Sequence, residues 1–273
     1  MENLNIVFYG IGRATAARRV HYQILINNLY KNYRLNIIEV LNDINKLTNQ
    51  KSNNLLINLK KKFIHKDSFK ILKSFSNSND VKKLLNISLT FEDVHADNYR
   101  SVSNFLQQLS MLEDSVKYYR PGLVLAIRDD LLFNEKLLLS YIKKTDRFLL
   151  LNKRVFLTSF FHSNTGICER IYFGSYENSL QVLTRINFVK KYFDEINKLS
   201  YLKKKGLNAE WLMRFVVEKK KLIPFCVPLF TKRLRVNYIK KERLFSHPRN
   251  WIHEKPTFNG LLRYFKFVCL NQF

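Results

Sequence analysis

The sequence predicts a single α/β domain, built on a mixed and mainly parallel sheet with helices on both faces. Three observations support this class. The chain opens with a strand, a glycine-containing turn, a helix and a second strand; a long amphipathic helix and a fully apolar strand follow near its middle; and no repeat or clear linker interrupts it. A chain of 273 residues is long enough to bury one substantial core.

The opening unit covers residues 5–41. Residues 5–10 (NIVFYG) form an apolar run typical of a buried strand, and GIGR ends it. Residues 14–30 predict a helix, because their apolar residues recur at approximately helical spacing. Residues 33–41 (YRLNIIEVL) predict the second strand. This order favours a βαβ unit.

The middle of the chain predicts one more helix and strand. Residues 42 to about 90 are rich in Asn, Lys and Ser, and we expect short helices and loops there. Residues 98–119 predict a helix that RPG ends. Its apolar face consists of Val102, Phe105, Leu106, Leu109 and Leu112. Residues 123–127 (LVLAI) then predict a fully buried strand.

The second half alternates between strand and helix patterns. Residues 146–151 (DRFLLL) and 154–161 (RVFLTSFF) predict strands, and a long helix is expected from about Tyr176. Residues 208–220 predict another helix, with Asn208 as its N-cap. The segment 222–230 (LIPFCVPLF) is expected to be extended.

The charge of the chain indicates an anionic partner. There are 47 Lys and Arg against 22 Asp and Glu, a formal net charge of +25. Nucleic acid, an anionic membrane surface or a phosphorylated substrate would each suit this balance. Because Lys and Asn are abundant everywhere, a compositional bias of the source would also account for part of the excess.

The cysteines and the apolar runs limit the cellular setting. Cys168, Cys226 and Cys269 are far apart, odd in number and form no CxxC, so neither a disulfide framework nor a zinc ribbon is indicated. The N-terminus shows no signal-peptide pattern, and no apolar run approaches the roughly 18 residues of a membrane span. We expect a reduced, cytoplasmic protein.

Charged residues directly follow the apolar strand 123–127. They are Arg128, Asp129 and Asp130, and apolar residues resume at Leu131. Ligands of open α/β sheets bind outside the carboxyl ends of strands, so we expect these side chains to face a ligand. In extended geometry Arg128 and Asp130 point to one side and Asp129 to the other. The alternative is a solvated turn.

The order of these motifs resembles GT-A-fold glycosyltransferases of the kind encoded in surface-polysaccharide and lipopolysaccharide loci and in some large viruses. The matching stretches are VFYGIGR (7–13), SNFLQQLSMLEDSVKYYRPG (103–122), RDDL (128–131), ERIYFGS (169–175) and a helix start at Glu210 followed by KRLRVN (232–237). Relatives often have Asp-Arg where this chain has Glu169 and Arg170. The resemblance implies a GT-A-like domain over residues 1–240 that transfers a sugar from a nucleotide-activated donor.

The resemblance also implies a donor site at the carboxyl ends of the first and middle strands. Gly10, Gly12 and Arg13 would approach the nucleotide and its phosphates. Arg128 would contact phosphate or fix a carboxylate through a bidentate pair. A GxG turn alone is weak evidence, because no third glycine completes a dinucleotide fingerprint and an ordinary turn has the same pattern.

A divalent cation is expected beside the donor phosphates. Mn²⁺ or Mg²⁺ held by a carboxylate would neutralise charge on the leaving nucleotide. Asp130 is the first candidate ligand of the cation, and Asp129 is the second. Asp130 and Arg128 are also both candidates for contacts with the donor.

Two glutamates are candidates for the general base that inverting sugar transfer requires. Glu210 would deprotonate the acceptor hydroxyl, and Glu169 is the competing candidate. A carboxylate in the first turn of a helix is also favoured by the helix dipole alone, which is the alternative for Glu210.

Four further residues are candidates for the acceptor or a phosphate. Gly174 and Ser175 would line the acceptor site, whereas Arg233 and Arg235 would hold a diphosphate. A solvated basic strand is the alternative for the two arginines.

The C-terminal region is strongly basic. Residues 200–273 contain 17 Lys or Arg against 4 Asp or Glu. We expect residues 241–273 to be a basic amphipathic extension, with one apolar helical face formed by Phe258, Leu261, Leu262, Phe265, Val268 and Cys269. Such a helix is typical of peripheral binding to an anionic membrane surface. A helix packed on the domain is the alternative.

These observations together predict a transferase in surface-glycan assembly. Its partners would be a nucleotide-sugar donor and a saccharide or lipid-linked acceptor at the inner membrane face, with no nucleic acid. Two alternatives remain open: a basic nucleic-acid-binding protein, although no RNP-type or helix-turn-helix pattern supports it, and a degenerate transferase that only binds glycan.

Overall fold

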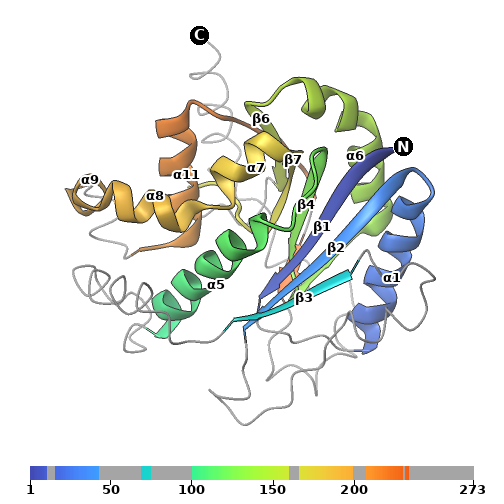
Figure 1. Cartoon of the computed structure of the whole chain (residues 1–273), viewed down its shortest axis with the longest axis horizontal. Helices are drawn as coiled ribbons and strands as arrows, with labels where there is room; N and C mark the ends of the chain where they lie inside the picture. The colour runs from blue at the N-terminus through green and yellow to red at the C-terminus, as the bar shows by residue number, and fades with distance from the viewer. Residues whose placement is uncertain are drawn as a thin grey trace.

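The computed structural model describes residues 1–10, 16–42, 69–74, 100–159, 166–198, 207–229 and 231–233. They form a seven-stranded sheet covered by helices on both faces, with a two-stranded sheet beside it (Figure 1). In the large sheet β7 runs antiparallel to both of its neighbours, and every other neighbouring pair is parallel. The predicted α/β class and mixed, mainly parallel sheet are confirmed.

The order of strands across the large sheet differs from their order in the chain. From edge to edge the strands are β3 (Phe69–Ser74), β2 (Tyr33–Asn42), β1 (Glu2–Gly10), β4 (Leu123–Arg128), β7 (Ile171–Ser175), β6 (Val155–Ser159) and β8 (Ile223–Val227). The strand after β1 lies on one side of it and β4 lies on the other. The sheet therefore has a topological switch point between β1 and β4, where open α/β sheets bind ligands.

Two hydrophobic cores lie on the two faces of the sheet, because side chains of successive strand residues point to opposite sides. Along β1, Leu4, Ile6 and Phe8 belong to one core, whereas Val7 and Tyr9 belong to the other. The core that contains Val7 and Tyr9 also receives helices α5 (Arg100–Val116), α7 (Tyr176–Val182), α8 (Arg185–Lys191), α9 (Phe193–Lys198) and α11 (Ala209–Lys220). Helices α1 (Ala16–Tyr30) and α6 (Glu135–Leu151) cover the opposite face.

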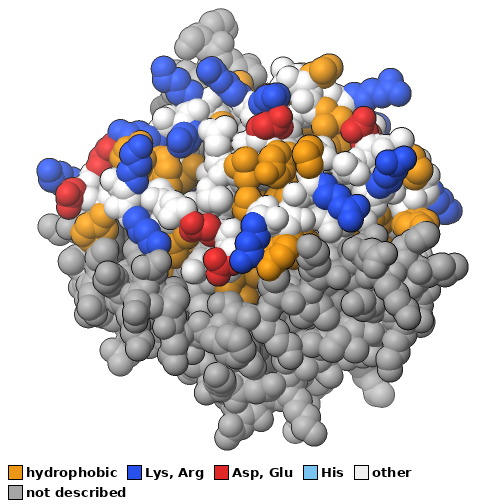
Figure 2. All heavy atoms as spheres, viewed as in Figure 1, with side chains coloured by type: hydrophobic (Ala, Val, Ile, Leu, Met, Phe, Trp, Pro, Cys, Tyr) orange, Lys and Arg blue, Asp and Glu red, His pale blue; other side chains and the backbone are white. Residues whose placement is uncertain are grey.

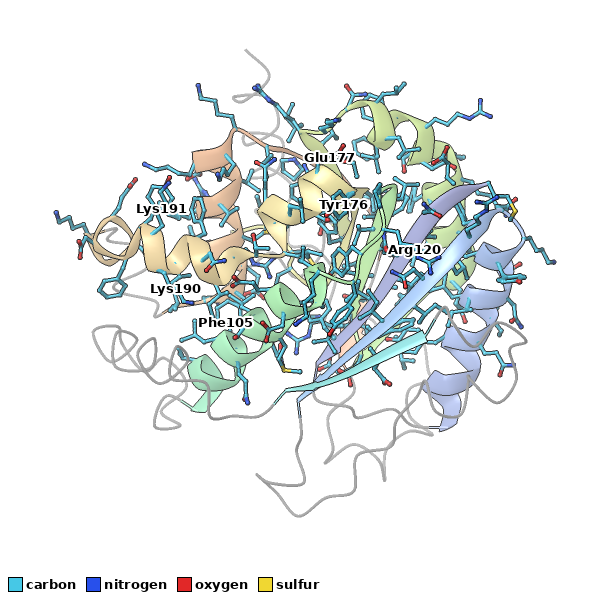
Figure 3. All side chains as sticks on the ribbon, viewed as in Figure 1. Phe105, Arg120, Tyr176, Glu177, Lys190 and Lys191 are labelled. Atoms are coloured by element: carbon cyan, nitrogen blue, oxygen red, sulfur yellow. The ribbon has the colours of Figure 1, made fainter. Side chains whose placement is uncertain are left out.

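Side chains fill the space between the sheet and the larger helical layer (Figure 3). The predicted apolar face of α5 is confirmed, since Leu106, Leu109 and Leu112 are buried. Phe105 of α5 and Tyr176 at the start of α7 pack against the same core. Helices α8 and α11 pack against each other in the same layer.

The small sheet lies directly after the charged turn. Strand β5 (Leu131–Phe133) pairs antiparallel with β9 (Thr231–Arg233), and Leu131 is opposite Arg233. Residues more than ninety positions apart in sequence therefore meet beside Asp130.

Three expectations for secondary structure were wrong. Residues 146–151 are not a strand but the end of α6, whose buried Leu138, Ile142 and Leu149 recur at helical spacing. The long helix from Tyr176 is three short helices; the first ends near Thr184, whose hydroxyl donates to the carbonyl of Leu180. Within residues 42–90, expected to form only short helices and loops, residues 69–74 form β3.

Other expected elements match closely. The helix after the opening strand is α1, the second strand is β2, and residues 123–127 lie in β4. Asn208 caps α11 as expected, because its side-chain oxygen accepts the N–H of Glu210 at 2.9 Å. The amphipathic extension at 241–273 lies outside the described residues.

Candidate functional site

The candidate site begins where β1 and β4 end side by side. Tyr9 and Arg128 are register partners, and the backbone N–H of Asp129 donates to the carbonyl oxygen of Tyr9 at 2.8 Å. The turn that follows β4 is therefore anchored to the end of β1. Asp129 and Asp130 leave the sheet at the switch point on a rigid support.

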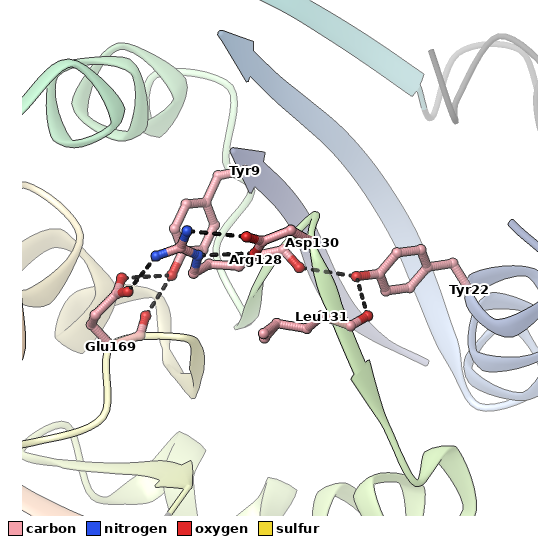
Figure 4. Close-up of polar contacts among 6 residues, drawn as sticks. All are labelled: Tyr9, Tyr22, Arg128, Asp130, Leu131 and Glu169. Carbon is pink, nitrogen blue, oxygen red and sulfur yellow. Dashed lines mark hydrogen bonds and ion pairs between the residues drawn. The ribbon is translucent and has the colours of Figure 1, made fainter. Parts of the chain in front are cut away.

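A guanidinium joins two carboxylates on the face of the sheet that carries α8 and α11 (Figure 4). Arg128 donates from Nε and Nη2 to the two oxygens of Asp130, at 3.1 and 3.3 Å, and from Nη1 to Glu169 Oε1 at 2.8 Å. Arg128 and Asp130 thus point to the same side, as predicted, and form the bidentate pair that was one of the two expected roles of Arg128. All three side chains are buried.

Two tyrosines hold this network from opposite faces of the sheet (Figure 4). The hydroxyl of Tyr9 lies 2.5 Å from the carbonyl oxygen of Glu169 and 3.3 Å from its Oε2. The hydroxyl of Tyr22, on α1, donates to the carbonyl oxygen of Arg128 at 2.9 Å. Neither tyrosine was identified from the sequence, because each resembles an ordinary core aromatic residue.

Gly10 makes room for Asp129. Its φ of +146° is a conformation that L side chains rarely adopt, and a Cβ at this position would lie 2.0 Å from Asp129 Oδ1. The carboxylate of Asp129 therefore lies directly against the backbone at the end of β1. Gly10, expected to approach the donor, and Asp129, expected to help with the metal, are brought together.

Glu210 is held in place through its backbone. Its carbonyl oxygen accepts the N–H of Ile167 at 3.0 Å, and a Cβ on Gly166 would lie 2.4 Å from that same oxygen. Gly166 thus permits the first turn of α11 to pack against the chain that leads into β7. The side chain of Glu210 is 8% exposed and, unlike Glu169, has no cation within ion-pair distance among the described residues.

The two glutamates are opposite in their affinity for a proton. Burial acts to raise the pKa of Glu169, but the charges of Arg128 and Arg185 and the hydrogen bond from Arg128 lower it below its ordinary value. Burial raises the pKa of Glu210, and the negative charge of Glu169 raises it further. Glu210 is therefore the stronger base of the two.

The other predicted residues fall in different places. Gly12, Arg13 and Arg235 lie outside the described residues. The backbone of Arg233 lies beside Leu131, next to the charged turn.

Gly174 and Ser175 are not near this turn. Ser175 is opposite Leu123, at the far end of β4 from Arg128, and its hydroxyl accepts the N–H of Asn178 as the N-cap of α7. A Cβ on Gly174 would meet the Tyr172 hydroxyl. Both residues have structural roles at the wrong end of the sheet, which argues against the acceptor-lining role that we expected.

A divalent cation would have one pair of carboxylates here. No group of three or more His, Cys, Asp or Glu side chains forms a metal site in the part of the chain that the structure describes. Two carboxylates are nevertheless a usual protein contribution for Mg²⁺, because substrate phosphates and water complete its shell. Asp129 and Asp130 are the candidate pair; the carboxylate of Asp129 lies against Gly10, and both oxygens of Asp130 are bound by Arg128.

Comparison with known proteins gives no family. No family model matches the chain, and no curated protein matches it. Among solved structures, it is similar to the galactosyltransferase LgtC in complex with donor and acceptor sugar analogues, at 10% identity and a TM-score of 0.42 over 77% of this chain and 69% of that one. Mouse xyloside xylosyltransferase 1 has 10% identity and a TM-score of 0.40, over 83% and 84% of the two chains.

A nucleotidyltransferase is also among the similar structures. A putative glucose-1-phosphate thymidylyltransferase from Bacillus anthracis has 9% identity and a TM-score of 0.43, over 89% of this chain and 94% of that one. Matches this weak assign neither a family nor an activity to the chain. The conclusions below rest on the sheet and the site.

Proposed function

We propose that this protein is a glycosyltransferase that moves a sugar from a nucleotide-sugar donor to a saccharide or lipid-linked acceptor. The observation that carries the proposal is the contrast in contacts and pKa between two glutamates near the switch point of an α/β sheet. Glu169 is fixed by Arg128, whereas Glu210 is buried, without an ion pair among the described residues, and raised in pKa. A carboxylate with these properties beside a ligand-binding edge suits a general base.

The donor side of the site is the end of β1. The close approach of Asp129 to Gly10 places a carboxylate at the backbone that the nucleotide phosphates would reach. Asp129, with Asp130 behind it, would hold Mn²⁺ or Mg²⁺. When bound, the cation would neutralise charge on the phosphates of the leaving nucleotide.

The acceptor side is the first turn of α11. Glu210 would take the proton of the acceptor hydroxyl onto its carboxylate as that oxygen attacks the sugar. The roles in the pair then follow from their contacts: Glu210 is the base, and Glu169 keeps Arg128 and Tyr9 in position. Of the two glutamates expected from the sequence, we therefore favour Glu210.

A thermal-shift screen across nucleotide-sugars, with and without Mn²⁺, tests the proposal. A ligand that binds the folded chain stabilises it by mass action, so a hit identifies the donor. Transfer to a saccharide acceptor would then be measured with that donor. Donor binding without transfer or hydrolysis would indicate the degenerate, glycan-binding alternative.

We further propose a role in surface-glycan assembly, with the protein at the inner membrane face. The net charge of +25 supports an anionic partner. On the face seen in Figure 2, the described Lys and Arg side chains are dispersed rather than aligned in one stripe. No helix in the described ranges is long and apolar enough to cross a membrane.

Sedimentation with anionic liposomes tests the membrane proposal. The full chain should bind at low salt and dissociate as the salt concentration rises, because surface attraction is screened. Deletion of residues 259–273 should weaken binding. If the full chain does not bind anionic liposomes even at low salt, the membrane proposal is wrong, whereas the proposed sugar transfer is unaffected.

A further inference from the structure

Arg185 is a buried cation whose hydrogen-bonding capacity is largely unused. It is 1% exposed, and its Nη1 donates to the carbonyl oxygen of Val182 at 2.9 Å and lies 3.6 Å from the sulfur of Met213. Its Nε and Nη2 have no hydrogen-bond partner among the described residues. Native proteins seldom bury charged donors without partners, because the lost hydration is not replaced.

Arg185 lies against α11, the helix that carries the candidate base. Met213 follows Glu210 by three residues on α11, so both lie on the same face of that helix. Arg185 therefore lies against the N-terminal half of α11. It is also near enough to Glu169, Glu210 and Tyr9 for their charges to oppose the lowering of its pKa by burial.

A second arginine contributes to the same place. Nη1 of Arg170 is buried and likewise has no hydrogen-bond partner in the part of the chain that the structure describes. Its positive charge acts on both Glu169 and Glu210. The N-terminus of α11, a helix of 12 residues, adds the positive end of its dipole on this side. The charge of Arg170 and the dipole of α11 thus act at Glu210 against the negative charge of Glu169.

We propose that Arg185 and Arg170, with the first turn of α11, form a binding site for an anionic group, either a phosphate or a carboxylate. A guanidinium offers donors in a planar fork that matches the oxygens of both groups. The Nε and Nη2 of Arg185 are one edge of that fork, and they are the two atoms without partners. An anion there would satisfy the donors that the protein leaves unpaired.

The site lies beside Glu210, so the anion belongs to the acceptor. This assignment rests on the proposed function, in which Glu210 deprotonates the acceptor hydroxyl. An acceptor that carries a sugar phosphate, a lipid-linked phosphate or an acidic sugar would have such a group. The arginines would then select charged acceptors over neutral ones and orient the attacking hydroxyl at the base.

Calorimetry with simple anions tests the site on the full chain. The probes are inorganic phosphate, glucuronate and, as the neutral control, glucose. We expect phosphate or glucuronate to bind, and Arg185→Gln and Arg185→Lys to weaken that binding roughly tenfold or more, because each variant removes the fork. Arg34→Gln, which removes one exposed arginine on β2, should leave it unchanged. Whichever probe binds more tightly indicates the class of acceptor.

The Nε–Hε resonance of Arg185 in ¹⁵N NMR spectra gives a second readout that needs no variant to fold. It should shift on addition of the probe that binds. If neither anion binds, if the Arg185 variants bind as tightly as Arg34→Gln, or if the resonance stays fixed while an anion binds elsewhere, the inference is wrong. No probe contains a nucleotide. A chain that binds phosphate at Arg185 but ignores every nucleotide-sugar would keep the site and refute the proposed function.

Discussion

Arg128 Nη1 lies 2.8 Å from Glu169 Oε1, and this contact separates the two glutamates of the site into different roles. The guanidinium keeps Glu169 ionised and in place. Glu210 has no such partner among the described residues, and the charge of Glu169 adds to burial in raising its pKa. Glu169 is therefore the structural carboxylate, and Glu210, whose pKa is raised first by burial, is the basic one.

The first prediction concerns turnover. Glu210→Gln should lower kcat by roughly 10²-fold or more, because a positioned general base contributes about that factor. The dissociation constant of the donor should change little, since the base contacts the acceptor. Glu218→Gln, an exposed position on the same helix, is the matched control and should keep normal kcat. A Glu210→Gln enzyme with near-normal kcat would remove Glu210 from the mechanism.

The second prediction concerns stability as a function of pH. A carboxyl with a lowered pKa stabilises the fold above its ordinary value of 4.5 and loses this contribution as the pH falls through its lower folded value. Glu169→Gln should therefore lower the free energy of unfolding by about 3 kcal/mol at neutral pH, as when one partner of a buried pair is removed. The difference should shrink in acid. Glu177→Gln, which breaks an exposed pair with Lys153, should cost no more than about 1 kcal/mol.

Glu210→Gln should change the free energy of unfolding in the opposite direction to Glu169→Gln. A raised pKa means that the fold disfavours the ionised form, a penalty that is present above the folded pKa and disappears as the pH falls below 4.5. The variant should therefore be at least as stable as the parent chain at neutral pH, and the gain should vanish in acid. Melts of both Gln variants between acid and neutral pH check the contrast. Parallel pH profiles for the two would contradict the assigned roles.

The third prediction compares two glycines with similar backbone angles. Gly10 has φ +146° beside Asp129, and Gly122 has φ +138° beside the backbone of Asn3, at the opposite end of the sheet. Both Gly→Ala variants should destabilise the fold by roughly 1–3 kcal/mol, because each strains the backbone. Only Gly10→Ala should also weaken donor binding beyond its loss of stability, since its methyl group displaces Asp129. Equal donor affinities in the two variants, measured below their melting temperatures, would move the donor site elsewhere.

The sequence predicted the framework of the fold well where the pattern is local. Each element of the opening unit has its own local pattern. The apolar face of α5 and the Asn208 cap likewise depend on residues that are close together in the sequence. Residues 146–151 were misassigned because three consecutive leucines look like a strand, and only the buried positions of the whole α6 reveal the helical period.

The site was predicted only where its contacts depend on neighbouring residues in the sequence. The shared direction of Arg128 and Asp130 follows from strand geometry alone. Their contact with Glu169 depends on how β7 pairs with β4, and the unused donors of Arg185 depend on how α8 packs against α11. No short-range pattern in the sequence encodes either contact. Gly174 and Ser175 lie at the far end of β4 from Arg128 because β7 runs antiparallel to β4, a direction that no short-range pattern in the sequence encodes.

The fourth prediction revises the roles of the two aspartates. From the sequence alone, Asp130→Asn should abolish transfer and metal-dependent donor binding without unfolding the chain. In the structure Asp130 is 1% exposed and forms a bidentate pair with Arg128. We therefore also expect Asp130→Asn to lower the free energy of unfolding by about 3 kcal/mol. Asp129 is also buried, at 3% exposed, so Asp129→Asn should lose stability too, and it should lose the effect of Mn²⁺ on donor binding. Calorimetry of donor binding with and without Mn²⁺ separates the two roles, and a normal response to Mn²⁺ in Asp129→Asn with a lost response in Asp130→Asn would reverse them.

The central claim is that the switch point between β1 and β4 binds a nucleotide-sugar. The most direct measurement is calorimetry of nucleotide-sugars with the full chain and with Asp129→Asn, each with and without Mn²⁺. We expect at least one nucleotide-sugar to bind the parent chain, more tightly with Mn²⁺, and the variant to lose the increase that Mn²⁺ gives. If no nucleotide-sugar binds with Mn²⁺ present, or if Asp129→Asn responds to Mn²⁺ as the parent chain does, the claim is contradicted.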